Sequence, residues 1–182
     1  MKKEKKVLMI SSTGLLGGGP KQISFLISRL SSEIKIYLAC PRENIFELDA
    51  NIDKKNIVNI RERKISLNDF IKVYKFIKKN KIDIVHSHGK GAAIYGRFLS
   101  LATNLPHVYT YHGIHLKCHS LIYKILYVIY ENIFGLIDSC KIFVSKSEIV
   151  AAKSNFLRIG KNRKVIFNGV EIIDKEFTKN NN

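Results

Sequence analysis

The chain has 182 residues, of which 46% are hydrophobic and 25% charged, and this balance is typical of a single soluble domain with a sizeable core. Lys and Arg outnumber Asp and Glu by 31 to 15, and the net charge of +16 favours anionic partners such as phosphorylated substrates, anionic lipid or nucleic acid. Three widely spaced cysteines without CxxC spacing fit a reducing compartment better than a disulfide framework, and no apolar run is long enough for a signal peptide or a membrane span. We therefore expect a cytoplasmic protein.

Short β-rich runs alternate with longer helical patterns along the chain. We expect strands at residues 6–12, 34–40, 56–60, 82–88, 106–113, 140–146 and 163–169. We expect helices at residues 20–32, 66–81, 90–104, 120–138 and 147–156. This alternation predicts an α/β fold, a Rossmann-like doubly wound parallel sheet with helices on both faces. Ligands of such sheets bind at the carboxyl ends of the strands, where the unusual residues of this sequence gather.

A glycine-rich loop, "STGLLGGGPKQ", follows the first strand. A dinucleotide fingerprint needs Gly at positions one, three and six, but Leu stands third counted from Gly14 and Gln stands sixth counted from Gly17. A P-loop is excluded too, because Pro20 occupies the lysine position and no Ser or Thr hydroxyl follows it. Two interpretations remain: a tight turn without a ligand, or a loop whose free amides bind an anion at the start of a helix.

Six histidines gather near the ends of the fourth and fifth strands. His86 and His88 alternate and so share one face of a strand. We interpret His86 as a hydrogen-bonded core residue, and His88 and His112, at the ends of their strands, as functional residues. A zinc site would need a helix that aligns His112, His115 and His119. Gly113 instead indicates a loop, and no acidic partner is close by, so we expect no metal.

Five segments, in this order, resemble the N-terminal domain of group 1 (family 4) retaining glycosyltransferases: "GLLGGGPKQ", "DIVHSHGKGAAIYGRFLSL", "HVYTYHG", "IFVSKSE" and "RKVIFNGVE". The resemblance covers about residues 6–172. It implies one half of a GT-B architecture, in which two Rossmann-like domains face each other across a cleft. The N-terminal domain of that family mainly carries the acceptor site, and the C-terminal domain holds most of the nucleotide-sugar donor. We accordingly expect one domain at residues 1–172 and a polar, disordered tail at 173–182.

The resemblance also implies site residues. Gly17, Gly18 and Gly19 match the loop that approaches the donor diphosphate, and His112 matches a histidine near the transferred sugar. Positions that match other residues of the cleft are Thr110, Gly113 and Ser145, beside which we place His88. Asn168 and Gly169 match the segment that crosses to the second domain.

The sequence departs from the family pattern after "NGVEI", where only ten residues follow. The family's residues that hold the donor phosphates belong to the second domain, so we expect no complete catalytic set here, no cofactor, and a nucleotide-sugar that enters as substrate. The chain is then a fragment, a truncated gene product or one half of a two-chain enzyme. The expected function is the N-terminal half of a glycosyltransferase for polysaccharide or lipid-linked acceptors in surface glycan synthesis (lipopolysaccharide or capsule), inactive alone. Alternatives are a non-catalytic acceptor- or membrane-binding partner subunit and a different Rossmann-like nucleotide enzyme.

The 120–138 pattern is apolar on nearly every side. It indicates either a helix wedged between the sheet and a neighbour, or a helix that contacts an anionic membrane at the inner face of the plasma membrane. The lysines of the 66–81 helix are interpreted as a solvated face. Aromatic residues are not interleaved with the basic ones, so we expect no nucleic-acid partner.

Overall fold

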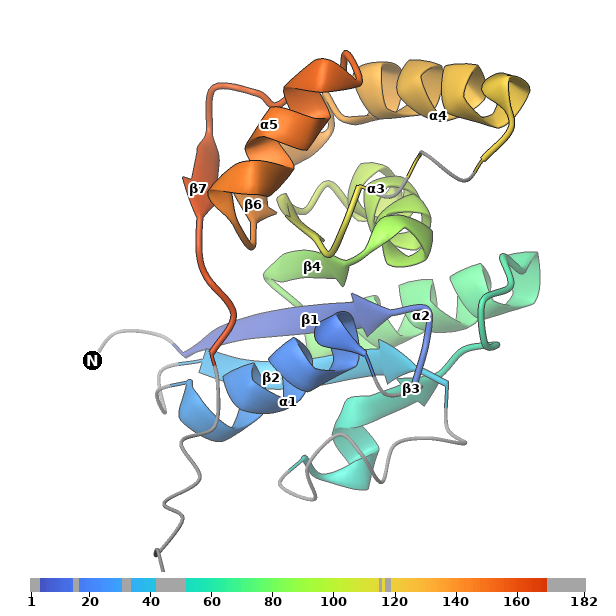
Figure 1. Ribbon diagram of the computed structural model, residues 1–182. Helices are drawn as coiled ribbons and strands as arrows, with labels where there is room; N and C mark the ends of the chain where they lie inside the picture. The colour runs from blue at the N-terminus through green and yellow to red at the C-terminus, as the bar shows by residue number, and fades with distance from the viewer. Residues whose placement is uncertain are drawn as a thin grey trace, which may run out of the picture.

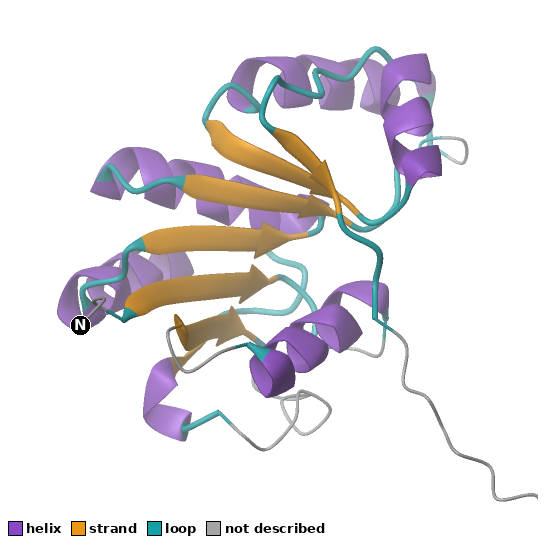
Figure 2. Cartoon of the chain, turned by 90° about the vertical axis from the view of Figure 1, so that its left-hand side faces the viewer, coloured by secondary structure: helices purple, strands orange, loops and turns teal. Residues whose placement is uncertain are grey.

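The computed structural model describes residues 4–14, 17–30, 34–41, 52–114, 116 and 119–169, and in them seven parallel strands form one sheet of order β3-β2-β1-β4-β5-β6-β7 (Figures 1 and 2). The strands are β1 (Lys5–Ser11), β2 (Ile34–Cys40), β3 (Ile57–Asn59), β4 (Ile84–His88), β5 (His107–Tyr111), β6 (Asp138–Phe143) and β7 (Arg163–Val165). The helices are α1 (Gly18–Arg29), α2 (Leu67–Asn80), α3 (Lys90–Thr103), α4 (Leu121–Phe134) and α5 (Lys146–Ser154), with a short 3-10 helix η2 (Lys54–Asn56). The Rossmann-like doubly wound fold predicted from the sequence is confirmed, while the expected tail at 173–182 lies outside the described residues.

Helices cover both faces of the sheet because successive strand residues point to opposite sides. Met9 and Leu38 pack with Ile23 of α1 on one face. Leu8 and Ile10 pack on the other face in a core that includes residues of α2 and α3. A third core joins α3, α4 and α5 to β5 and β6. Figure 1 shows α1 in front of β1 and β2, with α2 behind them.

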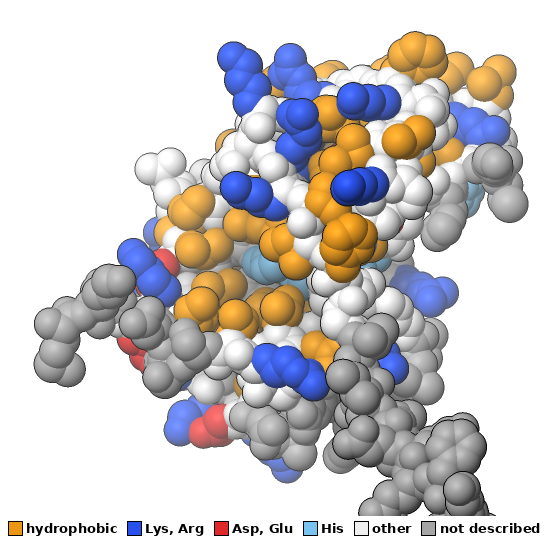
Figure 3. Space-filling model, turned by 60° about the vertical axis from the view of Figure 1, so that its left-hand side comes forward, with side chains coloured by type: hydrophobic (Ala, Val, Ile, Leu, Met, Phe, Trp, Pro, Cys, Tyr) orange, Lys and Arg blue, Asp and Glu red, His pale blue; other side chains and the backbone are white. Residues whose placement is uncertain are grey.

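The face that carries α1 is only partly covered. Residues of β4, β5 and β6 that point to this side remain half-buried: Ile84, His86, Val108, Cys140 and Ile142. In Figure 3, apolar and histidine side chains lie side by side on the surface, with Lys and Arg side chains around them. This half-covered face therefore offers apolar surface that no described element of the chain covers.

A buried ion cluster joins α3, α4, β5 and β6. Arg97 is fully buried and binds both oxygens of Glu131, with Nη1 and Nη2 at 3.1 and 2.9 Å. Its Nε and Nη2 also donate to Asp138, at 3.0 and 2.8 Å. Burial opposes the charges, but these hydrogen bonds outweigh it, so the pKa of Arg97 is raised and the pKa of Asp138 is lowered. Both side chains are therefore ionised inside the protein.

Two further side chains complete the buried ion cluster. The Nδ1 atom of His107 lies 2.8 Å from Asp138, and its Nε2 atom lies 2.9 Å from the hydroxyl of Ser87 on β4. Lys141 lies 3.6 Å from Asp138 and donates a 2.6 Å hydrogen bond to the carbonyl of Arg158. Side chains of α3, β5 and β6 thus contact the two carboxylates of the cluster.

The predicted end of the 120–138 helix is wrong. The helix α4 ends at Phe134, and β6 already begins at Asp138, which pairs with His107 of β5. The turn uses Gly135, because a Cβ atom there would lie 2.6 Å from Nζ of Lys141. Asp138 belongs to the strand because its carboxylate lies in the buried ion cluster, a long-range interaction that helical periodicity does not reveal.

Helix α4 is not wedged into the core. Only Tyr127 and Glu131 of this helix are buried. Most of its large apolar side chains are exposed: Leu121, Ile122, Tyr123, Ile125, Leu126, Ile129 and Ile133. The helix lies on the outside of the molecule in Figure 1. None of the helices in the described ranges is both long and apolar enough to cross a membrane.

We expect Arg97→Met to lower the free energy of unfolding by about 3–5 kcal/mol, because it leaves two carboxylates buried without their main partner. Urea denaturation followed by circular dichroism measures this loss. The matched change Arg158→Met, at an exposed side chain, should stay within about 0.5 kcal/mol of the wild type. Equal stability of the two variants would contradict the role given to the cluster.

Candidate functional site

A pocket of about 250 Å³, here the glycine-loop pocket, opens at the carboxyl ends of β1, β4 and β5. This is the edge at which parallel sheets bind ligands. It is lined by Ser11, Ser12, Thr13, Gly17, Gly18, Gly19, Pro20, Arg63, His88, Gly89, Lys90 and His112. Complete small-molecule sites have about 300–1,000 Å³, so this pocket has room for part of a larger ligand.

The three glycines form the beginning of α1. Gly17 is the N-cap residue, and its carbonyl accepts the first helical hydrogen bond, from Lys21. A Cβ atom on Gly19 would lie 3.5 Å from Cδ2 of His112, so the loop packs directly against the imidazole. A Cβ atom on Gly18 would have nothing within 4 Å, because this position faces open space. The loop thus brings its backbone close to His112 and keeps the mouth of the pocket clear.

Positive charge surrounds the glycine-loop pocket. A second helix, α3, begins at its edge after the N-cap residue Gly89, whose φ of 83° suits glycine. Lys90 and Arg63 add side-chain charges, and none of the described lining residues is acidic. Burial lowers the pKa of Lys90, while nearby Glu131 opposes this shift. Two helix N-termini and two basic side chains suit an anion such as a diphosphate.

His88 and His112 form a hydrogen-bonded pair. Nδ1 of His88 lies 3.2 Å from Nε2 of His112. The ring of His86 is tilted by 36° against that of His88, with the ring centroids 4.2 Å apart. The other nitrogens of the pair, Nε2 of His88 and Nδ1 of His112, are buried without a hydrogen-bond partner in the described part of the chain. The pair therefore has two unused hydrogen-bonding atoms beside the pocket.

His86, His88 and His112 are neutral at physiological pH. Burial lowers the pKa of His112 to about 4 and that of His86 to about 3, and it lowers the pKa of His88 well below its ordinary value. One proton is shared in the bond between His88 and His112, so one of the two free nitrogens is a donor and the other an acceptor, whichever tautomers form. A hydroxyl group, which can both donate and accept, suits either of these two nitrogens.

Not every residue expected in the cleft lines the pocket. Thr110 is buried, and its hydroxyl lies 2.8 Å from Nε2 of His86, so it supports the histidines from within the sheet. His86 thus has the hydrogen bond expected of it, but its side chain is half-buried on the partly covered face of the sheet instead of lying in the core. Gly113 follows His112 with a φ of 106°, which turns the chain away after β5. Ser145 caps α5 by accepting a hydrogen bond from the amide of Glu148.

The chain leaves β7 along α1. Ile166 still donates to the carbonyl of Phe143, and beyond it Asn168 and Gly169 are exposed. A Cβ atom on Gly169 would lie 3.9 Å from the ring of Phe25 in α1. The two residues predicted for the crossover are thus separate from the glycine-loop pocket.

The histidine triad considered for zinc cannot be assembled from the described residues, because His115 lies outside them. His119 is exposed and stacks on Tyr123, with ring centroids 4.2 Å apart. Among the described residues, no group of three His, Cys, Asp or Glu side chains is placed to hold a metal ion.

Two basic lining residues were not found from the sequence. Lys90 follows "HSHG" directly, and its place as the first residue of a helix after a strand end could have indicated it. Arg63 belongs to the irregular segment "RERK", which has no periodicity. It reaches the pocket because its amide bonds the carbonyl of Ser12, while the carboxylate of Glu62 accepts from the amide of Gly14.

We expect the stability of the protein to fall between pH 6.5 and about 4. A histidine whose pKa is lowered by folding stabilises the protein fully above its unfolded pKa of about 6.5, and this contribution is lost as the pH falls. The loss reaches about 1.4 kcal/mol per pH unit for each such histidine. Urea midpoints at pH 7.5 and 5.0 should therefore differ less for His112→Asn than for the wild type. Parallel changes in both proteins would refute this assignment.

A family model described as Glycosyltransferase Family 4 matches residues 16–172. Comparison with curated proteins finds no match. Among solved structures, the chain is similar to Anabaena Alr3699/HepE in complex with UDP and glucose, with a TM-score of 0.69 and 19% identity over 92% of this chain and 45% of that one. A glycosyltransferase from Rickettsia africae ESF-5 gives a TM-score of 0.65 and 20% identity over 93% and 44%.

The chain spans less than half the length of these structures. It is also similar to a UDP-GlcNAc 2-epimerase from Neisseria meningitidis bound to UDP-GlcNAc, with a TM-score of 0.56 and 15% identity over 90% of this chain and 46% of that one. Likeness at this level of identity shows the fold, which glycosyltransferases share with other enzymes.

Proposed function

The chain belongs to Glycosyltransferase Family 4, and we propose that it is the acceptor-side half of an enzyme that transfers a sugar from a nucleotide-sugar to a polysaccharide or lipid-linked acceptor in surface glycan synthesis. The observation that carries this proposal is the glycine-loop pocket, which joins an anion-binding loop to a pair of neutral histidines. The neighbouring Anabaena structures contain UDP, glucose and UDP-glucose, so ligands of this class occur on the same fold.

Each part of the pocket would bind one part of the donor. The amides of the glycine loop and the Arg63 and Lys90 side chains would contact the diphosphate. A free nitrogen of His88 or His112 would bond a sugar hydroxyl, which can act as donor or acceptor as that nitrogen requires. These groups can stabilise charge on a departing diphosphate. No carboxylate lines the described part of the pocket, so it has no general base or nucleophile of that kind.

We assign the remaining catalytic groups to a second domain or partner chain that faces this edge of the sheet. Two observations support this. The pocket is small and open, and the half-covered face beside β4, β5 and β6 presents apolar surface. Asn168 and Gly169, where the chain leaves β7 along α1, would begin the crossover between the two parts. A non-catalytic partner subunit that only binds the acceptor is the competing function.

Donor binding without turnover is the expected behaviour of the isolated chain. In an NMR titration, UDP-glucose should shift the amide signals of Gly17, Gly18 and Gly19, and Gly18→Leu should weaken binding at least fivefold, because its side chain would fill the open mouth of the pocket. Gly18→Ala is the matched control and should bind nearly as the wild type does. Both variants should unfold at the wild-type temperature.

Assays of sugar transfer and hydrolysis with a panel of nucleotide-sugars complete this test. Losing one side of the site removes several kcal/mol of transition-state stabilisation, since a single oxyanion donor is worth about 3 kcal/mol. Robust turnover by the chain alone would overturn the division between two halves. Absence of any nucleotide-sugar binding, with acceptor binding retained, would favour the non-catalytic subunit.

Contact with an anionic membrane is a second element of the proposed function. The exposed apolar side chains of α4 have no described partner, with Leu121, Ile122 and Leu126 exposed by 71%, 72% and 62%. The net charge of +16 would attract an anionic leaflet, and a lipid-linked acceptor would be presented there.

We expect the double variant Ile122→Ser/Leu126→Ser to reduce co-sedimentation with vesicles of 30% phosphatidylglycerol in phosphatidylcholine by at least threefold, because the apolar contact is lost. Leu67→Ser, at an equally exposed apolar residue of α2, is the matched control and should not change binding. Unchanged binding of the α4 variant would rule out this helix as the contact.

A further inference from the structure

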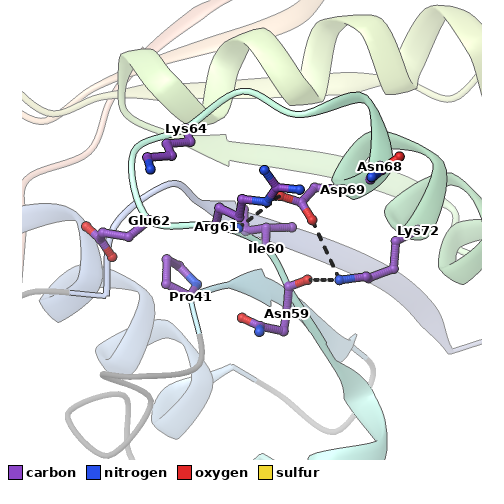
Figure 4. Close-up of a pocket in the computed structure, with 9 residues that line it drawn as sticks. All are labelled: Pro41, Asn59, Ile60, Arg61, Glu62, Lys64, Asn68, Asp69 and Lys72. Atoms are coloured by element: carbon purple, nitrogen blue, oxygen red, sulfur yellow. Dashed lines mark hydrogen bonds and ion pairs between the residues drawn. The ribbon is translucent and has the colours of Figure 1, made fainter.

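A second and larger pocket lies at the same edge of the sheet. It has a volume of about 630 Å³ and opens where β2 and β3 end and α2 begins (Figure 4). We call it the basic pocket, because much of its polar lining is basic or neutral: Asn59, Arg61, Lys64, Asn68 and Lys72. This volume falls in the range of about 300–1,000 Å³ that is typical of ligand sites. It is larger than the volume of the glycine-loop pocket.

Two acidic side chains, Asp69 and Glu62, also line the basic pocket, and both bond to other parts of the protein. Asp69 is buried, accepts a 3.1 Å hydrogen bond from the amide of Arg61, and lies 3.6 Å from both Nε of Arg61 and Nζ of Lys72. Glu62 accepts from the amide of Gly14 and pairs with Arg63. The three cations of the lining, Arg61, Lys64 and Lys72, outnumber these two carboxylates, so the described lining carries a net positive charge.

Two cations keep free donors. The terminal nitrogens of Arg61 have no hydrogen-bond partner in the described ranges, and Lys64 has no ion pair there. The segment that carries Lys64 is held in place, because the hydroxyl of Tyr95 donates to the Lys64 carbonyl at 2.9 Å and accepts from the amide of Ser66 at 2.8 Å. A fixed backbone and free cationic side chains suit a bound anion.

The chemistry of the pocket identifies its ligand class. A guanidinium binds carboxylate or phosphate through parallel hydrogen bonds, and an ammonium adds charge from another direction. The side-chain amide of Asn68 can bind a hydroxyl group next to that anion. The combination fits a sugar that carries a carboxylate or a phosphate.

The basic pocket adjoins the glycine-loop pocket. Glu62 lines the first and Arg63 lines the second, and these consecutive residues are fixed to the Ser12–Gly14 segment by the bonds from Arg63 to Ser12 and from Gly14 to Glu62. A glycan chain that begins at the transfer point can therefore continue into the basic pocket over this loop.

We propose that the basic pocket is an acceptor subsite for an anionic sugar residue, bearing a carboxylate or a phosphate, next to the position where the new sugar is attached. This inference rests on the proposed function for its role in transfer. The binding of an anionic sugar by Arg61 and Lys64 is a property of this chain and can be measured without turnover.

The test is an NMR titration of the chain with sodium glucuronate, glucose 6-phosphate and neutral glucose. Both anionic sugars should shift amide signals of Arg61, Lys64 and Asn68, and glucose should not. Arg61→Gln and Lys64→Gln should each weaken this binding at least threefold. Lys75→Gln is the matched control. It changes an exposed lysine of α2 that lies outside the pocket, and it should leave the binding of the anionic sugars unchanged. The tighter of the two anionic probes identifies carboxylate or phosphate as the acceptor group.

Equal binding of glucose, or anionic-sugar binding that neither variant weakens, would overturn the inference. Lys64→Gln changes an exposed side chain, so it keeps the test valid should Arg61→Gln disturb Asp69. A parallel titration with UDP-glucose separates the two proposals. Shifts at the glycine loop without anionic-sugar binding would leave the proposed function and remove this subsite, and the converse would leave a sugar-binding pocket and remove the transferase assignment.

Discussion

The bidentate contact between Arg97 and Glu131, together with the bonds from Arg97 to Asp138, is the constraint on which the packing of α3, α4 and β6 depends. It joins α3, α4 and β6 through three side chains that are buried inside the protein. Each carboxylate is costly to bury alone and tolerable only with its cations. The cluster therefore specifies which helix packs where, because any other arrangement would leave a charge buried without its counterion.

The same cluster fixes the strand ends that carry the candidate site. His107 bonds both Asp138 and Ser87, so β4 and β5 are tied together on the side of α3. One residue beyond Ser87, on the opposite face, is His88, which meets His112. Gly96 lets α3 approach Ser87 and His107 closely, since a Cβ atom there would collide with both. That close packing also positions the beginning of α3, with Lys90, at the glycine-loop pocket.

The sequence was sufficient for the features that depend on local pattern. Apolar runs and helical periodicity predicted every strand and the five α-helices, and strand-end position singled out the glycine loop, His88 and His112. It failed where long-range charge pairing decides, as at Asp138, whose partners are 31 and 41 residues away in the chain. Arg63 was also missed, because it reaches the pocket through long-range hydrogen bonds of an irregular loop, which the sequence pattern does not reveal. Strand-end position alone was also misleading for two residues. The hydroxyl of Ser145 caps α5, and the hydroxyl of Thr110 lies at hydrogen-bond distance from His86, so neither lines the glycine-loop pocket.

The charge of the protein acquires a spatial meaning from these contacts. Two of the described acidic side chains at the carboxyl edge bond the protein backbone. Glu62 accepts from the amide of Gly14 in the glycine loop, and Asp69 of α2 accepts from the amide of Arg61. Basic side chains at the same edge keep free donors at two adjacent pockets. Under the proposed function, an edge built in this way would attract the phosphates and carboxylates of donor and acceptor. Among the described residues, no carboxylate that could move protons lines the glycine-loop pocket. Under the proposed function this half therefore holds and orients two anionic substrates, and the chemistry of transfer depends on groups brought from the facing side.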